Sequence, residues 1–399
     1  MKSNNNNLPK GWRKVKLGEI VEKVIDNRGK NPPLSNIKTE YKLIDTLQLT
    51  DDTRYPNFDD ETKQRYVSED VYNTWFRTGH PLAGDILMST VGSGIPKWNL
   101  FPSEGNFCIA QNLIGLRTNK NKANSEFIFY YFRQETFLKM VKGIIIGGAQ
   151  PSIKVPHFLD LEIAIPDDIN EQKRIADILS AFDEKIEVNN KIIKILEEMA
   201  QEIFKEWFVR FRFPGWQKVK FVDSELGKIP EGWEVKKLGD ILSLEYGKAL
   251  TAPNRKAGNI PVYASSGIVG YHNEKLDNGP GIIVGRAGIP GSVYWSQTDF
   301  YCVDSAFYVK TTISKYFVYY LLKYQNLESL VSGSAVPGLN RNMVYLNLAV
   351  LPNIEIINKF EDFIKPVFLK IYNLKAENQT LAELRDLLLP KLMSGEIRV

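Results

Sequence analysis

A tandem repeat is the feature of this sequence that most constrains its fold. The segments Leu8-Pro9-Lys10-Gly11-Trp12 and Leu17-Gly18-Glu19-Ile20 return as Ile229-Pro230-Glu231-Gly232-Trp233 and Leu238-Gly239-Asp240-Ile241. Further pairs follow in the same order: Gly94-Ile95-Pro96 with Gly288-Ile289-Pro290, Cys108 with Cys302, Tyr130-Tyr131 with Tyr319-Tyr320, Ala149-Gln150-Pro151 with Ala335-Val336-Pro337, and Ile165-Pro166 with Leu351-Pro352. Because self-similarity of this size marks a duplicated structural unit, we expect two related globular domains. Their intervening residues differ, which indicates two surfaces that bind different things.

Composition sets the broad class of the protein. A chain with 43% hydrophobic and 12% aromatic residues can bury ordinary cores in two domains. It contains no apolar run of about 18 residues and no signal peptide, so we expect a cytoplasmic protein without a membrane partner. Residues 1–7 are polar and are expected to form a disordered leader.

Cysteine and histidine usage argues against a metal site. The chain has 2 cysteines, no Cys-x-x-Cys pattern and 3 histidines, which fits neither a disulfide framework nor structural zinc. Cys108 and Cys302, at matching places in the two copies, are interpreted as small buried strand residues. His272 has no second metal ligand at useful spacing.

Each globular segment is followed by a heptad-patterned helix. Apolar residues recur in steps of three and four, with one asparagine near the middle of each stripe. The first stripe is Ile175, Leu179, Phe182, Ile186, Asn189, Ile193, Leu196, Ala200, Ile203 and Trp207, and the second is Ile357, Phe360, Ile364, Val367, Ile371, Leu374, Asn378, Leu381, Arg385, Leu388 and Leu392. Such stripes require a partner helix, so we expect an antiparallel coiled coil with Asn189 near Asn378. The alternative is that each helix packs only on its own domain. Pro366 is expected to kink or interrupt the second helix.

These observations predict an α+β protein in which two repeated domains are separated by two long paired helices. The boundaries are 8–167 for the first domain, 168–212 for the central helix, 213–228 for a linker, 229–354 for the second domain, 355–393 for the C-terminal helix and 394–399 for a tail.

The ordered motifs resemble one known family. They are the Pro-x-Gly-Trp opening, the Ala149-Gln150-Pro151 turn, the strand ending at Ile165-Pro166, the helix starting Asn170-Glu171-Gln172-Lys173-Arg174 and the terminal Leu389-Pro390-Lys391-Leu392-Met393. Singly they are weak, but in this order and in duplicate they resemble the specificity subunit of type I restriction-modification systems. The resemblance covers nearly the whole chain.

The resemblance implies a DNA-binding scaffold that performs no chemistry. In this family two target recognition domains each read one part of a split, asymmetric DNA sequence, and the helices space them. Two methyltransferase subunits dock on the chain and supply S-adenosylmethionine, so the chain itself needs no cofactor. Motor-nuclease subunits join for cleavage.

Candidate DNA contacts lie on glycine-rich and polar loops, where glycines let the backbone approach a ligand and hydroxyl, amide or guanidinium groups reach phosphates or base edges. Arg286 is the most attractive single candidate, because a planar guanidinium can pair with guanine O6 and N7. The alternative roles for Arg286 are a phosphate clamp or an internal ion pair. The full set is Lys63, Gln64, Arg65, Tyr66, Ser89, Thr90, Ser93, Gln150, Lys154, Tyr263, Ser265, Ser266, Tyr271, His272, Arg286, Asn340 and Arg341.

Two other functions are alternatives to this one. Asn31-Pro32-Pro33-Leu34 resembles the signature with which amino-methyltransferases hold a flipped base, but Leu34 offers no aromatic ring for stacking. Without a cofactor loop or a catalytic constellation, a self-contained DNA-modifying enzyme is disfavoured. A coiled-coil scaffold that does not bind DNA is the third hypothesis.

Overall fold

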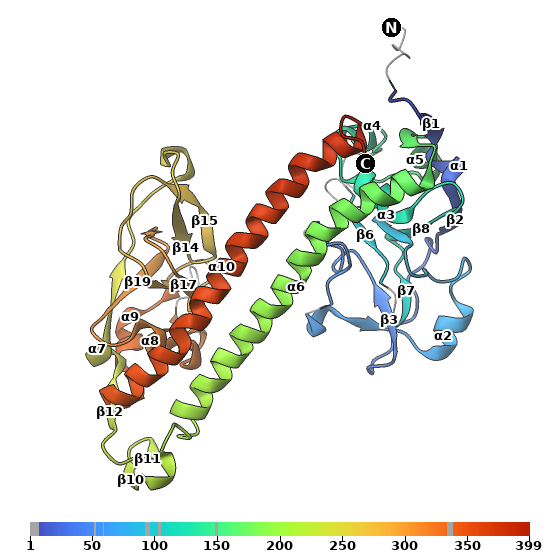
Figure 1. The fold of residues 1–399 in the computed structure, drawn as a ribbon. Coiled ribbons are helices and arrows are strands. Elements are labelled where there is room, and N and C mark those ends of the chain that lie inside the picture. Colours follow the sequence, from blue (N-terminus) through green and yellow to red (C-terminus); the bar gives the residue numbers. More distant parts are fainter. Residues whose placement is uncertain are drawn as a thin grey trace. The chain divides into compact units, whose positions relative to one another are not determined.

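The structure is a computed structural model that describes residues 8–51, 53–58, 60–91, 96–102, 105–147, 151–332 and 338–399. The leader 1–7, Ser93 and Gln150 and the second Ala335-Val336-Pro337 motif lie outside this part of the chain. The chain divides into two compact units (Figure 1). Unit 1 comprises residues 1–189 and 377–399, and unit 2 comprises residues 190–376.

Two 40-residue helices run through both units. They are α6 (Ile169–Phe208) and α10 (Ile354–Met393). The boundaries between the units fall inside these helices, so each unit contains one globular domain and one half of each helix. α10 continues through Pro366, so the proline does not interrupt it. Because Asp362, one turn earlier, is exposed, water can satisfy the carbonyl that lacks a partner N–H.

Unit 1 is built from three sheets and short helices. β1 (Trp12–Lys16) pairs antiparallel with β9 (Glu162–Pro166). A four-stranded antiparallel sheet has the order β2 (Val21–Ile25), β8 (Leu113–Thr118), β5 (Ile86–Ser89), β6 (Trp98–Leu100), and a three-stranded sheet has the order β4 (Arg65–Tyr66), β3 (Tyr41–Ile44), β7 (Asn106–Ile109). The helices are α1 (Leu17–Ile20), η1 (Glu61–Lys63, a 3₁₀ turn), α2 (Glu69–Thr74), α3 (Ser125–Phe132), α4 (Glu135–Gly143) and α5 (Val155–Leu159).

Unit 2 repeats this plan. β12 (Glu234–Lys237) pairs with β22 (Leu348–Leu351). The four-stranded sheet has the order β13 (Leu242–Tyr246), β19 (Ala306–Thr311), β16 (Gly281–Gly285), β17 (Val293–Ser296). The three-stranded sheet has the order β15 (Gly267–His272), β14 (Ile260–Ala264), β18 (Tyr301–Cys302). Two further antiparallel pairs are β10 (Phe221–Ser224) with β11 (Gly227–Pro230) and β20 (Val331–Ser332) with β21 (Gly338–Leu339). The helices are η2 (Trp216–Lys218), α7 (Leu238–Ile241), η3 (Ala252–Asn254), α8 (Lys315–Tyr324), η4 (Leu327–Leu330) and α9 (Arg341–Leu346).

Equivalent backbone hydrogen bonds establish the repeat residue by residue. The amide of Thr90 donates to the Asn112 carbonyl over 2.9 Å, as that of Arg286 does to Ser305 over 2.9 Å. The carbonyl of Thr90 accepts from Ile153 over 3.0 Å, and that of Arg286 accepts from Leu339 over 2.8 Å. Thr90 and Arg286 are therefore equivalent positions, and the predicted fold of two repeated α+β domains with two long helices is confirmed.

The two cysteines are not equivalent, which corrects the sequence alignment by one residue. Ala110 donates to the Ile44 carbonyl and accepts from Leu113, and Val303 makes the same pair of bonds with Tyr263 and Ala306. Cys302 therefore matches Ile109 and not Cys108. Because successive strand residues point to opposite faces, Cys108 and Ile109 pack into different clusters of unit 1.

Both thiols are nevertheless buried strand residues, as predicted. Burial raises the pKa of each thiol to about 12, so both are protonated at neutral pH. A buried, protonated thiol is a packing group rather than a nucleophile.

In unit 1 the two helices pair through polar groups. The Asn189 amide donates to Asn378 Oδ1 over 2.9 Å and to Glu377 Oε2 over 3.0 Å. Further along, buried Asp183 forms an ion pair with Arg385. Residue numbers rise along one helix as they fall along the other, so the pairing is antiparallel. Ile175 and Leu179 of α6 and Leu392 of α10 join the core of the first domain.

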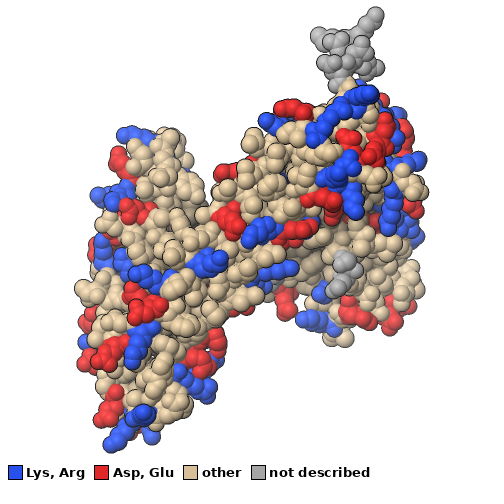
Figure 2. Space-filling model, viewed as in Figure 1, with Lys and Arg blue, Asp and Glu red and all other residues tan. Residues whose placement is uncertain are grey.

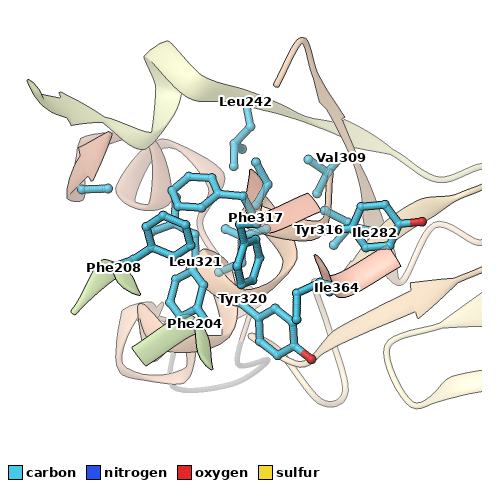
Figure 3. Close-up of a cluster of buried hydrophobic side chains, with 14 of the residues drawn as sticks. Phe204, Phe208, Leu242, Ile282, Val309, Tyr316, Phe317, Tyr320, Leu321 and Ile364 are labelled. Atoms are coloured by element: carbon cyan, nitrogen blue, oxygen red, sulfur yellow. The ribbon is translucent and has the colours of Figure 1, made fainter. Parts of the chain in front are cut away.

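In unit 2 the corresponding contacts are aromatic. Phe208 of α6 lies 4.9 Å from Phe317 and 4.9 Å from Phe360, measured between ring centroids. Phe204 lies 5.7 Å from Tyr320, and these rings belong to one cluster that joins the helices to the second domain (Figure 3). Glu197 and Lys375 form an exposed ion pair of 3.1 Å beside this seam, again in the antiparallel sense.

Candidate nucleic-acid interface

The register of the four-stranded sheet in unit 2 gathers three loops at one edge. Tyr246 at the end of β13 pairs with Phe307, and Gly285 at the end of β16 pairs with Ala306 at the start of β19. The ends of β13 and β16 therefore meet at the same edge, because neighbouring strands are antiparallel. The amide of Leu339 donates to the Arg286 carbonyl, which holds the start of α9 at this edge as well.

An exposed tyrosine at this edge lies beside two arginines. The Cζ atom of Arg286 is 5.8 Å from the centroid of the Tyr246 ring, and that of Arg341 is 4.9 Å from it. Tyr246 is 53% exposed. Arg286 and Arg341 were candidates from the sequence, whereas Tyr246 was missed. An aromatic residue at the exposed end of a predicted strand was the available signal. We call these three residues the Arg-Tyr-Arg cluster.

Each guanidinium of this cluster is anchored by a backbone carbonyl. Arg286 Nε donates to the Asp304 carbonyl over 2.8 Å, and Arg341 Nη1 donates to the Leu244 carbonyl over 3.4 Å. Among the residues that the structure describes, no carboxylate forms an ion pair with either arginine. The internal ion pair weighed for Arg286 is therefore not found in the described chain.

The equivalent edge of unit 1 carries different chemistry. Asp26 follows β2 and binds Arg28 through two hydrogen bonds of 2.8 and 2.6 Å, and the guanidinium holds the pKa of this carboxyl below its usual range. Thr90, in the place of Arg286, is buried and its hydroxyl donates to the Asn112 carbonyl. Ser89 is also buried and accepts from the Lys97 amide. Lys154 remains exposed at this edge.

The other candidates in unit 2 divide into internal and exposed groups. His272 is buried and its Nδ1 accepts from the Lys256 amide, while buried Tyr263 donates its hydroxyl to the Trp295 carbonyl. Ser265 is buried too, and Asn340 caps α9 by accepting from the Asn342 amide. Ser266 and Tyr271 are exposed on the β14–β15 hairpin.

The polar segment 63–66 of unit 1 occupies a comparable place. β4 is the edge strand of its three-stranded sheet, as β15 is in unit 2. Lys63 pairs with Asp60 at 2.7 Å and Arg65 pairs with Asp45 at 3.0 Å, so both cations have acidic partners. Gln64 donates to the Arg65 carbonyl, and Tyr66 is half-buried.

Charge is mixed over the surface. On the face shown in Figure 2, Lys and Arg side chains alternate with Asp and Glu side chains on both units. Among the described residues no group of three His, Cys, Asp or Glu side chains gathers as a metal site would require. No helix in the described ranges is long and apolar enough to cross a membrane.

The duplicated α+β domain and the paired helices are matched by one family model. The family model for the type I restriction modification DNA specificity domain matches residues 9–198 and 230–369. The chain therefore belongs to the family of type I restriction-modification specificity subunits.

Two relatives and one solved structure illustrate the membership. The type I restriction enzyme MjaIX specificity subunit of Methanocaldococcus jannaschii is 32% identical, with 98% of this chain and 95% of the relative covered. A putative MjaX specificity subunit from the same organism is 26% identical over 98% of this chain and 95% of its own length. The crystal structure of a type I S subunit from M. genitalium superimposes with a TM-score of 0.62 at 18% identity, over 98% of both chains, which shows a shared fold.

Proposed function

We propose that this specificity subunit reads a bipartite, asymmetric DNA site, with one half-site recognised by each domain, and that it performs no catalysis itself. One observation carries the proposal. Equivalent sheet edges in units 1 and 2 present unlike groups, with the Asp26–Arg28 pair on one and the Arg-Tyr-Arg cluster on the other, where Arg286 replaces the buried Thr90. Unlike donors and acceptors on a common frame suit the reading of unlike base sequences.

This proposal retains as direct contacts the candidates that are exposed or half-buried and that do not cap a helix. Lys63, Arg65, Lys154, Ser266 and Tyr271 are exposed. Gln64, Tyr66, Arg286 and Arg341 are half-buried and are retained with them. Ser89, Thr90, Tyr263, Ser265 and His272 are buried and support the loops from inside.

The long helices are proposed to dock two methyltransferase subunits, which bind S-adenosylmethionine, with motor-nuclease subunits completing the complex. α6 supports this with a second apolar stripe, distinct from its seam. Within unit 2, Ile192, Ile195 and Met199 are 37%, 61% and 38% exposed, and their spacing places them on one helix face. An exposed apolar stripe of this kind suits an amphipathic helix of a partner.

Ile195→Asp should prevent the chain from copurifying with its cognate methyltransferase subunit. Ile195 is largely exposed, so the substitution leaves the fold intact, but it would bury a charge at the docked interface. Pull-down of the methyltransferase with the tagged chain measures the effect. Gln201→Asp places the same charge at an exposed position on the opposite side of α6 and should bind normally. Equal recovery with both variants would contradict docking at this stripe.

Exchanging residues 229–354 for the equivalent block of a relative should change one half of the methylated motif and leave the other half unchanged. The physical reason is that each domain has its own core and its own sheet edge. Long-read sequencing of DNA from cells that express the methyltransferase and either chain reads the motif directly. The reciprocal exchange of residues 8–167 should alter the other half.

Two results, the second from a separate assay of the purified chain, would overturn the proposal. A block exchange that changes both halves together would refute reading by separate domains. Methyl transfer by the purified chain alone with S-adenosylmethionine would instead identify a self-contained enzyme.

A further inference from the structure

We propose that the Arg-Tyr-Arg cluster is the specificity-determining contact of the second domain, and that its ligand is the major-groove edge of a guanine. The inference rests on the proposed function and names residues for one half-site. A guanidinium can donate to a pair of neighbouring acceptor atoms, which guanine provides as O6 and N7 and phosphate provides as two oxygens. Tyr246 is a positioning residue that holds the guanidiniums of Arg286 and Arg341.

Arg286 is held so that one end of its guanidinium faces outward. Its backbone is fixed on both sides, by donation to Ser305 over 2.9 Å and acceptance from Leu339 over 2.8 Å. Its Nε donates to the Asp304 carbonyl, which leaves the two terminal nitrogens as a fork. A guanidinium ordered before binding loses less entropy when it forms two parallel hydrogen bonds.

The turn beside Arg286 is tightly packed and supports this order. A Cβ at Gly285 would lie 2.2 Å from the Ile289 carbonyl oxygen and 2.3 Å from Ser292 Oγ. Gly285 also donates to the Ser292 carbonyl and accepts from Gly291. A backbone closed in this way presents Arg286 from a rigid element, as base readout requires.

Tyr246 makes the proximity of two cations tolerable. Its ring lies within cation–π distance of both guanidiniums, and the negative face of an aromatic ring stabilises nearby positive charge. The ring is braced in turn by Phe307, with centroids 5.0 Å apart and planes at 61°. Removal of the ring should therefore release both arginines.

The two arginines of the cluster differ from several other cations of the described chain, which have acidic partners. Lys310 pairs with Asp277 at 2.6 Å and Lys275 with Asp299 at 2.7 Å in the same unit, and Arg28 pairs with Asp26 in unit 1. Arg286 and Arg341 instead bind only carbonyl oxygens within the described part of the chain. Their charge is thus available to an acceptor outside the protein.

The test compares variants of the full chain in complex with the methyltransferase subunit. The wild-type motif is first mapped by long-read sequencing, and duplexes with each single-base change in that motif are then titrated by gel shift. Arg286→Ala and Arg286→Lys should each reduce discrimination at one guanine of one half-site by about 10- to 100-fold, because lysine keeps the charge but not the fork. Tyr246→Ala should relax the same position, and Tyr246→Phe should not.

Lys323→Ala is the matched control. Lys323 and Tyr319 both lie on α8 in the same unit, with the Lys323 ammonium 5.0 Å from the centroid of the Tyr319 ring. α8 packs on β16 and β17 of the four-stranded sheet. Its loss removes a similar cation–tyrosine contact and one positive charge, and the motif should not change.

The outcomes separate this inference from the function on which it rests. If Arg286→Ala weakens binding equally for all duplexes and lowers the salt slope by about one, the ligand is a phosphate and the guanine assignment is overturned. Unchanged affinity and motif in both Arg286→Ala and Tyr246→Ala would refute the site while leaving the function intact. A wild-type complex that methylates no bipartite motif would overturn the proposed function itself.

Discussion

Replacement of Asp183 with alanine is expected to lower the free energy of unfolding of unit 1 by about 3–5 kcal/mol. Asp183 is 4% exposed, accepts a 2.7 Å hydrogen bond from the Tyr130 hydroxyl and forms ion pairs with Arg385 and, at 3.7 Å, with Arg133. Without the carboxylate, two guanidiniums whose side chains are only 17% and 12% exposed would lose the anion that they share, although Arg385 would keep its exposed partner Asp386. Burial already lowers the pKa of Arg133, which indicates that its charge is held there at a cost.

Urea unfolding monitored by circular dichroism measures this loss. Glu197→Ala is the matched control, since it breaks the ion pair between Glu197 and Lys375 of the same two helices. These side chains are 54% and 60% exposed, so the substitution should lower the free energy of unfolding by less than about 1 kcal/mol. Asp183→Asn keeps an acceptor for Tyr130 but no charge and should fall between the two. A change of under about 1 kcal/mol in Asp183→Ala would show that this cluster is not a determinant of stability.

Insertion of one heptad into each long helix is expected to change the preferred spacing of the two half-sites. The insertions belong between Asn189 and Asn190 and between Ala376 and Glu377, where the units divide, so that neither unit is altered internally. Seven residues lengthen a helix by about 10 Å and keep the apolar stripe in phase. At about 3.4 Å per base pair, the spacer should grow by about three base pairs.

Three additional base pairs between the half-sites also rotate the second half-site by about 100° around the duplex axis, relative to the second domain. Binding should therefore either move to the longer spacer or fail because the second half-site faces away. Methylation mapping distinguishes these results. A single insertion in one helix should disrupt the helix pairing, since that helix would then be seven residues longer than its partner between the two units. An active double insertion with the original spacer would show that the helices do not set the distance.

The sequence predicted the large-scale architecture because its signals are local and repeated. The Gly-Trp openings, the heptad stripes and the terminal Ile165-Pro166 and Leu351-Pro352 strands each depend on nearby residues. Because the segments repeat in the same order, the fold expected for the first domain also predicted that of the second. Pro366 was expected to kink or interrupt the second helix, and the continuous α10 excludes the interruption.

The site was less predictable because its geometry depends on contacts between distant segments. The Arg-Tyr-Arg cluster joins the end of β13, the residue after β16 and the start of α9, and only strand pairing brings them together. Thr90 and His272 are buried and bind Asn112 and Lys256. These partners lie in other segments of the chain, so no local pattern reveals the contacts. The one-residue error in matching Cys108 with Cys302 arose because the segments between the anchors differ in length.

The division of the units inside the helices has a consequence for the order in which the protein assembles during synthesis. Residues 190–376 are contiguous, so unit 2 can fold as soon as they leave the ribosome. Unit 1 begins with residues made earlier but needs 377–399, and until Leu389, Leu392 and Met393 arrive its core around Ile175 and Leu179 stays open. The domain translated first is thus completed after the second, and a chain that stops before Glu377 exposes the core of its first domain rather than that of its second.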